Sequence, residues 1–472
     1  MVIIADRIQA TPLPPCGEEL QDISTFPGEE KYNQSLVIYN PAFSHLQPSF
    51  FALPKTEQDI QRCLKCSLEN FIPISVRGGG HHGLGYSTLG SEGFVIYLSE
   101  MDQVVIDDAS KVIHVGAGSR MGAVYEKMGS EYLLPGGLCP AVGVSGYTLG
   151  GGYSMLSRYL GLAIDNLLSV TMVTANGSSV VVANSTVHPD LFWALRGGGG
   201  GNFGVVTKFT FQLHPAQPNY VFGAIKYRGD EQIRDFLKLL KTAPELPKEL
   251  HLEVTVFPEE EVTLEPLYIG DYNDALELLK PYIEIASSVD LKNFSSYLEV
   301  HRLVGEPFPV ISPLPEMLRG CVLKEMSDEA AKILSEAKVP ESCQITLDHF
   351  GGAVNEVAPD ETAYPYRNVS FYYYAQCWYS NATQYDKMVQ FENKLFDSLI
   401  QGGHCTGGYI NDVDRQVSDW QHFYYGGNYE RLVEIKQAWN PRESGMLHFL
   451  HEIGSDYQPR SLGDESWKFS VL

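Results

Sequence analysis

Two adjacent histidines follow a run of glycines in the first quarter of the chain. Residues 76–87 read VRGGGHHGLGYS, so His81 and His82 come directly after three glycines. Glycine lets a backbone turn sharply or approach another group closely, because it has no Cβ. Imidazole is a polar group that can act as a nucleophile or a ligand. The stretch therefore predicts a loop that holds a histidine against a bound group.

A second glycine-rich segment carries a single cysteine. Residues 134–166 read LPGGLCPAVGVSGYTLGGGYSMLSRYLGLAIDN, with Cys139 in the first turn. So many glycines predict a backbone that wraps around a bulky ligand, with its N–H groups directed at polar atoms such as those of a pyrophosphate. A lone cysteine is more often a buried and inert thiol. Its place in this kind of loop nevertheless favours a functional role for Cys139.

Three weaker motifs are set aside. The segment VGAGSRMG at 115–122 is one residue too long for the dinucleotide-binding fingerprint. The run GGGGGNFGVV at 197–206 lacks the Gly-Lys-Ser/Thr ending of a P-loop, and we interpret it as a tight, flexible turn. Cys63 and Cys66 have CxxC spacing without a second pair, which favours two cysteines on a helix face over a zinc site. In an oxidising compartment, one of these two cysteines is available to pair with Cys16.

The elements that position these motifs change character along the chain. Between residues 47 and 215, glycine clusters alternate with short β-branched runs and short helical stretches, a mixed α/β pattern. From about residue 216, glycine becomes rarer and amphipathic helical segments alternate with strand-like runs until about residue 410. The clearest are helices at 230–243 and 272–288 and strands at 250–257, 343–350 and 370–380. Residues 428–441 predict a last helix that ends at Pro441.

Composition limits the function classes. The 472 residues contain 34 Lys and Arg against 58 Asp and Glu, a formal net charge of -24. This acidity argues against a nucleic-acid partner and against adhesion to anionic membranes, and favours a neutral or cationic small-molecule substrate. No apolar run approaches the ~20 residues that span a bilayer. The sequence leaves the oligomeric state open.

The compartment has two interpretations. The first residues, MVIIADRIQATPLPPCGEEL, lack the apolar core of a signal peptide, which favours a cytoplasmic protein. Six Asn-x-Ser/Thr sequons favour a secreted protein whose leader has been removed, because such sequons are used only in the secretory pathway. They lie at Asn33, Asn176, Asn184, Asn293, Asn368 and Asn381.

Four segments resemble, in order and spacing, the berberine-bridge-enzyme-like flavoproteins of the vanillyl-alcohol-oxidase superfamily. They are VRGGGHHGLGYS, PGGLCPAVGVSGYTLGGGYSMLSRYLGLAIDN, DLFWALRGGGGGNFGVVT and NYERLVEIKQAWNP. The resemblance implies an α+β fold with a PCMH-type FAD-binding domain of two α/β subdomains and a substrate domain whose mainly antiparallel sheet is backed by helices. We place the FAD-binding domain at 1–215 (core from about 45), the substrate domain at 216–425, and a returning C-terminal segment at 426–472.

The resemblance also implies a doubly attached flavin and no metal. In the family pattern R-x-G-G-H the histidine is bonded to the flavin 8α-methyl carbon, which is His81 here, with His82 as a neighbour. In the pattern G-x-C-P-x-V-G the cysteine sulfur is bonded to flavin C6, which is Cys139. We expect the two loops to close on the ring system from opposite edges. Further FAD contacts are predicted at Arg77, Gly79, Gly80, Val142, Gly143, Gly146, Gly150, Gly151 and Asn411.

The same resemblance suggests the catalytic groups. A valine three residues after the cysteine, here Val142, is associated with access of O₂ to the flavin, so an oxidase that releases H₂O₂ is predicted over a dehydrogenase. Hydride transfer to flavin N5 needs a base for the accompanying proton. The family draws it from an acid before a Gly-Gly, here Asp348, and from the last tyrosine of Y-x-N-Y, which is Asp412 in this chain. We interpret Asp412 as the base and Asp348 as its partner.

Alternatives remain open at this stage. In one alternative, Asp412 is an ordinary loop residue and the base is lost or is supplied by another part of the chain. On the strand at 370–380, alternation with period two places Tyr373 and Gln376 on opposite faces, so at most one of them points into the site. We predict that this residue is Tyr373. Gly83, where relatives commonly carry a tyrosine, and Asp412 favour oxidation or oxidative cyclisation of a natural product. The other candidates are a carbohydrate or alcohol oxidase, a dehydrogenase, and a non-redox member of the family.

Overall fold

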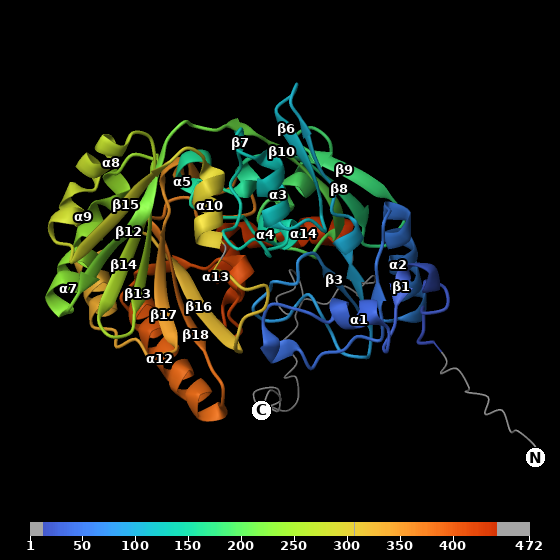
Figure 1. The fold of residues 1–472 in the computed structure, drawn as a ribbon. Helices are drawn as coiled ribbons and strands as arrows, with labels where there is room; N and C mark the ends of the chain where they lie inside the picture. The colour runs from blue at the N-terminus through green and yellow to red at the C-terminus, as the bar shows by residue number, and fades with distance from the viewer. Residues whose placement is uncertain (1–12, 306, 441–472) are drawn as a thin grey trace, which may run out of the picture.

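The protein folds into two lobes. The computed structural model describes residues 13–305 and 307–440. The glycine-rich first part of the chain forms one lobe, and a single large antiparallel sheet with its helices forms the other (Figure 1). The chain passes from the first set of strands to the large sheet between Pro215 and Tyr220. The mixture of parallel strands, antiparallel sheets and helices confirms the predicted α+β class.

The N-terminal sheet carries the loop with the two histidines. Its strand order is β1 (Ser24–Thr25), β2 (Phe51–Ala52), β4 (Phe94–Tyr97) and β3 (Ile74–Arg77), and β2 and β3 both run parallel to β4. Helix α1 (Glu30–Ser35) precedes β2, and helix α2 (Glu57–Asn70) forms the crossover between β2 and β3. The α2 helix begins at a capping box in which the Thr56 side chain accepts from Asp59 N at 3.2 Å. The loop of interest leaves directly from the end of β3.

The second sheet supports the loop with the cysteine. It is antiparallel, in the order β5 (Val104–Asp107), β6 (Val112–Gly116), β10 (Gly204–Gln212), β8 (Leu167–Thr174) and β9 (Val180–Asn184). β7 (Tyr132–Leu133) and β11 (His214–Pro215) form a separate pair. The connections contain α3 (Met121–Met128), α4 (Val144–Leu149), α5 (Ser157–Leu160) and α6 (Pro189–Ala194). The segment that bears Cys139 lies between β7 and α4.

The large sheet dominates the second lobe. Its order is β15 (Ser288–Phe294), β12 (Tyr220–Arg228), β14 (Glu261–Ile269), β13 (Leu250–Phe257), β17 (Cys343–His349), β18 (Phe371–Trp378), β16 (Glu316–Leu323) and β19 (Cys405–Gly407). All neighbouring pairs are antiparallel. The predicted strands at 250–257, 343–350 and 370–380 are therefore confirmed as β13, β17 and β18.

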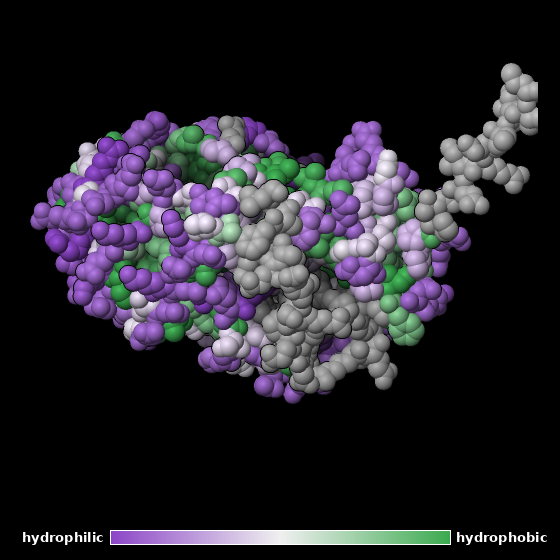
Figure 2. All heavy atoms as spheres, turned by 90° about the horizontal axis from the view of Figure 1, so that it is seen from below, coloured by the Kyte–Doolittle hydropathy of each residue, from purple (hydrophilic) through white to green (hydrophobic). Residues whose placement is uncertain are grey.

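Helices cover one face of this sheet and leave the other to the first lobe. The covered face packs against α7 (Asp230–Leu239), α11 (Asp328–Ser335) and α12 (Ala382–Gln401), with α8 (Tyr272–Leu278) and α9 (Lys280–Glu284) beside them (Figure 1). Helix α10 (Tyr297–Gly305) instead contributes Tyr297 and Val300 to the core of the first lobe. Seen from below, hydrophilic residues cover most of the visible surface, with hydrophobic residues in small groups (Figure 2). No helix within 13–305 and 307–440 is long and apolar enough to cross a bilayer.

The end of the described chain returns to the first lobe. After β19 the chain forms a 3₁₀ turn at Ile410–Asp412, then α13 (Trp420–Tyr425) and α14 (Tyr429–Trp439). α14 packs beside α6, where Arg431 pairs with Asp190 at 2.8 Å. The predicted last helix is therefore confirmed, whereas Pro441 lies outside the described residues.

Three disulfides lie within the lobes, one in the first lobe and two in the second. Cys66 is bonded to Cys16, which confirms that one of the two α2 cysteines pairs with Cys16. Cys63 is a buried free thiol. The two disulfides of the second lobe are Cys321–Cys405 and Cys343–Cys377, and the latter joins residues directly opposite each other on β17 and β18.

Two buried arginine side chains connect the lobes. Arg158 on α5 donates to the carbonyls of Leu250 at 2.7 Å and Phe350 at 2.6 Å in the second lobe. Arg367, just before β18, donates through both terminal nitrogens to Asp165 of the first lobe at 2.7 and 2.8 Å. The side chains of Arg367 and Asp165 are 1% and 9% exposed, so removal of one partner leaves a buried unpaired charge.

We expect Asp165→Asn to lower the free energy of unfolding by about 3–5 kcal/mol, because it leaves the buried Arg367 without a counter-ion. Asp190→Asn is the matched control, since Asp190 pairs with Arg431 at 2.8 Å but the two side chains are 71% and 44% exposed. That substitution should cost less than about 1 kcal/mol. Urea unfolding of both variants measures the difference, and equal losses would contradict the role assigned to Asp165.

Candidate active site

A cavity of about 420 Å³ lies where the two lobes meet. Three glycine-rich loops of the first lobe form one side of it. Residues of β13, β17 and β18 and the 3₁₀ turn at Ile410–Asp412 form the other side. The predicted site residues that line it are Gly79, Gly80, His81, His82, Cys139, Val142, Gly143, Gly146, Asp348, Asn411 and Asp412.

His81 and Cys139 meet in this cavity. The His81 Nε2 atom lies 3.4 Å from the Cys139 Sγ atom, although the two residues are 58 positions apart. Burial lowers the pKa of His81 to about 4, so its imidazole is neutral and nucleophilic. Burial raises the pKa of the Cys139 thiol, and nearby backbone N–H groups partly oppose this effect. Both side chains therefore reach the same part of the cavity.

The two loops touch through glycines. A Cβ atom on Gly79 would lie 2.4 Å from the Gly143 nitrogen, and a Cβ atom on Gly143 would lie 2.2 Å from the Gly79 nitrogen. Any side chain at either position would therefore push the loops apart. Glycine at both positions is what allows His81 and Cys139 to come together.

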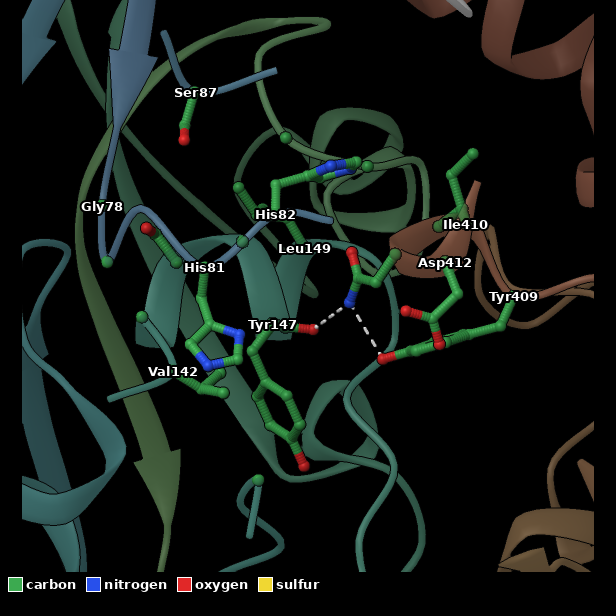
Figure 3. Close-up of a pocket in the computed structure, with 18 of the residues that line it drawn as sticks. Gly78, His81, His82, Ser87, Val142, Tyr147, Leu149, Tyr409, Ile410 and Asp412 are labelled. Carbon is green, nitrogen blue, oxygen red and sulfur yellow. Dashed lines mark hydrogen bonds between the residues drawn. The ribbon is translucent and has the colours of Figure 1, made fainter. Parts of the chain in front are cut away.

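The adjacent histidine turns away from Cys139. The rings of His81 and His82 point in different directions (Figure 3). His82 stacks on Tyr86 with ring centroids 4.7 Å apart, and its Nδ1 accepts from the Leu84 nitrogen at 3.0 Å. His82 thus lines the cavity without approaching Cys139.

Three predicted cofactor contacts do not line the cavity. The guanidinium of Arg77 is 1% exposed and donates to the carbonyls of Ser35 and Ser87, so it holds the loop in shape. Gly150 and Gly151 lie at the end of α4, where a Cβ on Gly150 would lie 2.1 Å from Asn411 Oδ1. Gly150 makes room for Asn411, whose Nδ2 donates to Tyr147 O at 3.0 Å and Tyr409 Oη at 2.9 Å (Figure 3).

The glycine run at 197–206 lines the cavity, which its sequence alone did not predict. Gly199, Gly200 and Gly201 line the cavity together with Asn202, instead of forming only a flexible turn. The signal was present, because the run precedes β10 as a third glycine cluster of the same lobe. Its backbone forms the part of the cavity wall beyond α4.

The cavity fits a large polar cofactor such as FAD. The buried Asn202 Oδ1 and Ser87 Oγ atoms both belong to lining residues and have no hydrogen-bond partner in the described chain. Gly146, within α4, has nothing within 4 Å of the position that a Cβ would occupy. The wall therefore offers unpaired polar atoms and open backbone, as a ligand with many acceptors and donors requires.

Two acidic side chains face the cavity from the second lobe. Asp412 accepts from the Tyr372 hydroxyl at 2.8 Å, and burial raises its pKa to about 6. Burial also raises the pKa of Asp348 to about 7, and the charge of Asp412 adds to this effect. The predicted pair is therefore brought together, and burial raises the pKa of both acids.

A third acid, Glu253, was not predicted. It lies directly opposite Asp348 on the neighbouring strand β13 and also lines the cavity. Burial raises its pKa well above the usual range, and the charges of Asp348 and Glu265 contribute. No motif surrounds Glu253 in the sequence; only its register with Asp348 reveals it.

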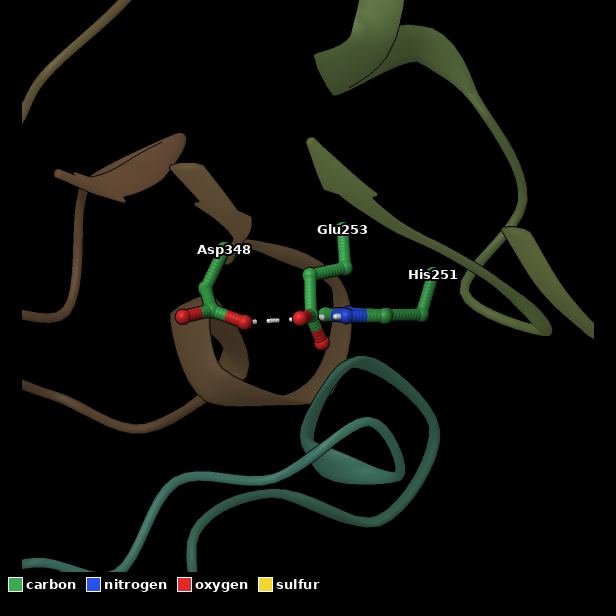
Figure 4. A group of neighbouring side chains, drawn as sticks. All are labelled: His251, Glu253 and Asp348. Atoms are coloured by element: carbon green, nitrogen blue, oxygen red, sulfur yellow. Dashed lines mark ion pairs between the residues drawn. The ribbon is translucent and has the colours of Figure 1, made fainter. Parts of the chain in front are cut away.

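His251 joins this acidic group (Figure 4). Ligand atoms of His251, Glu253 and Asp348 all lie within 4.8 Å of one another, and His251 Nε2 is 3.9 Å from Asp348 Oδ1. Burial, together with the positive charge of Arg158, lowers the pKa of His251 to about 3. The same guanidinium opposes binding of a cation, so we interpret the group as acids that share protons.

The prediction that Tyr373 points into the site is wrong. Tyr372 lies opposite Asp348 in the β17–β18 register, so even-numbered residues of β18 share its face. Tyr374 and Gln376 accordingly line the cavity. Tyr373 is 0% exposed and packs in the core under the helices of the second lobe.

Related proteins match this chain over most of its length. The family profile described as "FAD binding domain" matches residues 48–183, and the profile "Berberine and berberine like" matches residues 408–444. A Bacillus subtilis protein named as an uncharacterized FAD-linked oxidoreductase, YgaK, is 30% identical over 87% of this chain and 92% of its own length. Monolignol oxidoreductase AtBBE-like 13 of Arabidopsis thaliana is 28% identical over 87% of this chain and 84% of its own. Tetrahydroberberine oxidase of Argemone mexicana is 25% identical over 84% and 81%.

Solved structures share the fold. The wild-type BBE-like 1 of Physcomitrella patens superposes with a TM-score of 0.86 at 25% identity, covering 95% of this chain and 100% of its own. Berberine bridge enzyme from Eschscholzia californica gives a TM-score of 0.83 at 22% identity, covering 91% and 96%. These superpositions include both lobes.

The raised pKa values of the buried acids predict that stability falls as pH rises. The pKa of Asp348 rises from 3.8 in the unfolded chain to about 7 in the folded one, so the folded protein binds more protons between these values. The contribution of Asp348 to stability is therefore fully present below pH 4 and is lost as the pH rises through about 7. We expect Asp348→Asn, which mimics the protonated acid, to be more stable than the wild type at pH 8 and to show a shallower decline.

Urea unfolding between pH 5 and 8 measures this effect. The control is Asp102→Asn, because Asp102 is exposed and lies outside the cavity. Parallel curves for the wild type and Asp348→Asn would contradict the pKa assigned to Asp348.

Proposed function

Because the chain belongs to the berberine-bridge-enzyme-like family of FAD-linked oxidoreductases, we propose that it is an oxidase whose FAD is attached through His81 and Cys139. It removes a hydride from an organic substrate and delivers the electrons to O₂, which is released as H₂O₂. The observation that carries the proposal is the 3.4 Å separation of His81 Nε2 and Cys139 Sγ inside the cavity. When bound, FAD supplies the hydride acceptor at N5 and the reaction with O₂.

The base of the reaction is assigned to Asp412. Its lower pKa of about 6 makes it the carboxylate that is ionised near neutral pH, while Asp348 still holds its proton part of the time. The Tyr372 hydroxyl donates to Asp412 Oδ2 and fixes the carboxylate. Asp412 accepts the proton that leaves the substrate, and a negative charge on the neighbouring Asp348 favours the protonated form of Asp412.

We assign the route by which O₂ reaches the flavin to the part of the cavity around Val142. This side chain lines the cavity three residues after Cys139. A short β-branched side chain there leaves more room than a leucine would. This supports the oxidase over the dehydrogenase interpretation.

The substrate is assigned to neutral or cationic natural products with an aromatic body. Among the described residues that line the cavity, three are acids and none is Lys or Arg. An anionic substrate would meet uncompensated negative charge there. Tyr39, Tyr374 and Phe308 supply aromatic surface, and two relatives carry the names monolignol oxidoreductase and tetrahydroberberine oxidase. Carbohydrate oxidation is the second candidate, because the three carboxyl groups that line the cavity can also accept hydrogen bonds from the hydroxyl groups of a sugar.

Acid precipitation tests the covalent flavin. We expect the yellow colour to stay with the denatured wild-type chain, and tryptic peptides that contain His81 and Cys139 to carry the added mass. His81→Ala and Cys139→Ala should each retain the flavin through the remaining bond, whereas the double variant should release it on denaturation. A wild-type pellet without colour would contradict the attachment, and a double variant that keeps its flavin would place the bonds elsewhere.

Asp412→Asn tests the base. Release of H₂O₂ with a panel of sugars, aryl alcohols and amines first identifies a substrate, and anaerobic stopped-flow then measures flavin bleaching. We expect Asp412→Asn to slow bleaching by about 10²–10⁴-fold, the usual contribution of a general base. In the wild type the rate should rise with pH through about 6, because Asp412 acts only when ionised, and this rise should be absent in the variant.

The matched control for this test is Asp419→Asn, since Asp419 is an exposed carboxylate on the same segment of chain. It should bleach at the wild-type rate. If Asp412→Asn bleaches as fast as the control, Asp412 is not the base.

A further inference from the structure

We propose that Tyr39 and Glu316 are positioning residues for flavin attachment: Tyr39 holds the plane of the His81 imidazole, and Glu316 holds Tyr39. The proposal rests on the proposed attachment at His81 and adds two residues that no motif identifies. Tyr39 belongs to the first lobe and Glu316 to the start of β16 in the second lobe. Neither residue contacts the acids that we assign to substrate oxidation.

The contact between Tyr39 and His81 is a face-to-face stack. The ring centroids lie 3.9 Å apart and the planes are inclined by 18°. The Tyr39 nitrogen also donates to Gly80 O at 2.9 Å, so the backbone of Tyr39 is fixed to the residue that precedes His81. The tyrosine is therefore tied to the attachment loop both by its ring and by its backbone.

A stack suits a nucleophilic imidazole better than a hydrogen bond does. The lone pair of an imidazole nitrogen lies in the ring plane, so the direction of attack is set once that plane is fixed. A hydrogen-bond donor on the attacking nitrogen would occupy the lone pair. Tyr39 contacts the face of the ring and leaves its edge, where Nε2 lies 3.4 Å from Cys139 Sγ, directed into the cavity.

Glu316 fixes the tyrosine in turn. The Tyr39 hydroxyl donates to Glu316 Oε2 at 3.1 Å, and the same oxygen accepts from Gln376 Nε2 at 3.0 Å and from Ser312 Oγ at 3.4 Å. Glu316 is only 8% exposed, so its carboxyl group makes its hydrogen bonds within this local network and not with solvent. A buried carboxyl group that accepts from both a tyrosine hydroxyl and a side-chain amide is a rigid anchor.

The neighbouring Asn40 strengthens the same connection. Its Nδ2 donates to Gly83 O at 2.7 Å in the attachment loop and to Glu316 O at 3.0 Å in β16. Tyr39 and Asn40 therefore form a strap that links the attachment loop to the second lobe. The orientation of His81 is set by the docking of the two lobes as well as by its own loop.

Attachment makes this orientation useful. It forms a bond between an imidazole nitrogen and the 8α carbon, and breaks one C–H bond of that methyl group. The methyl proton and the imidazole N–H proton pass to water, and two electrons remain on the ring system. O₂ takes up these electrons with two protons as H₂O₂, so that atoms and electrons balance.

The test uses full-length chains that carry Cys139→Ala, so that only the bond to His81 is counted. The ratio of acid-stable to total bound flavin is measured after purification, together with the mass of the peptide that contains His81. We expect Tyr39→Leu to lower this ratio about tenfold or more, because loss of the stack frees the imidazole plane. Native protein should still bind flavin non-covalently, and the melting temperature should change little.

Two further variants separate the two roles. Tyr39→Phe keeps the stack and should retain at least about a third of the parent ratio, whereas Glu316→Ala removes the anchor and should fall between Tyr39→Phe and Tyr39→Leu. The matched control is Tyr86→Leu, which removes the corresponding stack from His82 at 4.7 Å. Its ratio should equal that of the parent.

Each outcome decides the proposal. An unchanged ratio in Tyr39→Leu overturns it, and so does an equal fall in Tyr86→Leu, which would show general damage to the cavity. If Tyr39→Leu does not fold, an unchanged ratio in Glu316→Ala overturns the role of the anchor. If the Cys139→Ala parent itself holds no acid-stable flavin, the attachment at His81 is wrong and both proposals fall together.

Discussion

The backbone contact between Gly79 and Gly143 is the constraint on which the site depends. A Cβ at either position would lie within 2.4 Å of the opposite backbone, so the two loops can come this close only with glycine at both positions. The meeting places His81 and Cys139 3.4 Å apart at one end of the cavity. Arg77 supports the same arrangement from behind by donating to the carbonyls of Ser35 and Ser87. The glycines thus have a geometric role, and the arginine a supporting one.

The second lobe contributes acids at a cost in stability. Alternation along antiparallel strands sends Asp348, Glu253 and Tyr374 to the cavity and their neighbours to the helices. Like charges directly opposite each other on adjacent strands are unfavourable, and Asp348 and Glu253 form such a pair. A fold selected only for stability would place apolar residues there. Burial raises the pKa of both acids, which favours their neutral forms and relieves this repulsion.

Sequence predicted the elements well and the site only in part. Period-two runs located β13, β17 and β18, and the glycine motifs located His81 and Cys139, because both signals are local. The inward face of β18 could not be predicted, since a choice between Tyr373 and Tyr374 depends on register with Asp348. Glu253 and Tyr39 were missed for a related reason. Each acquires its role from a partner that is distant in the sequence.

The two lobes hold complementary parts of one cavity. The first lobe carries His81 and Cys139, and the second carries the acids that line the other side, so neither lobe alone contains the whole site. Their separation is fixed by buried links of three kinds: Arg158 on carbonyls, Arg367 on Asp165, and the strap of Tyr39 and Asn40 on Glu316. Of these links, only the strap also contacts the His81 imidazole. The orientation of this imidazole is therefore coupled to the docking of the lobes, because the same residues hold both.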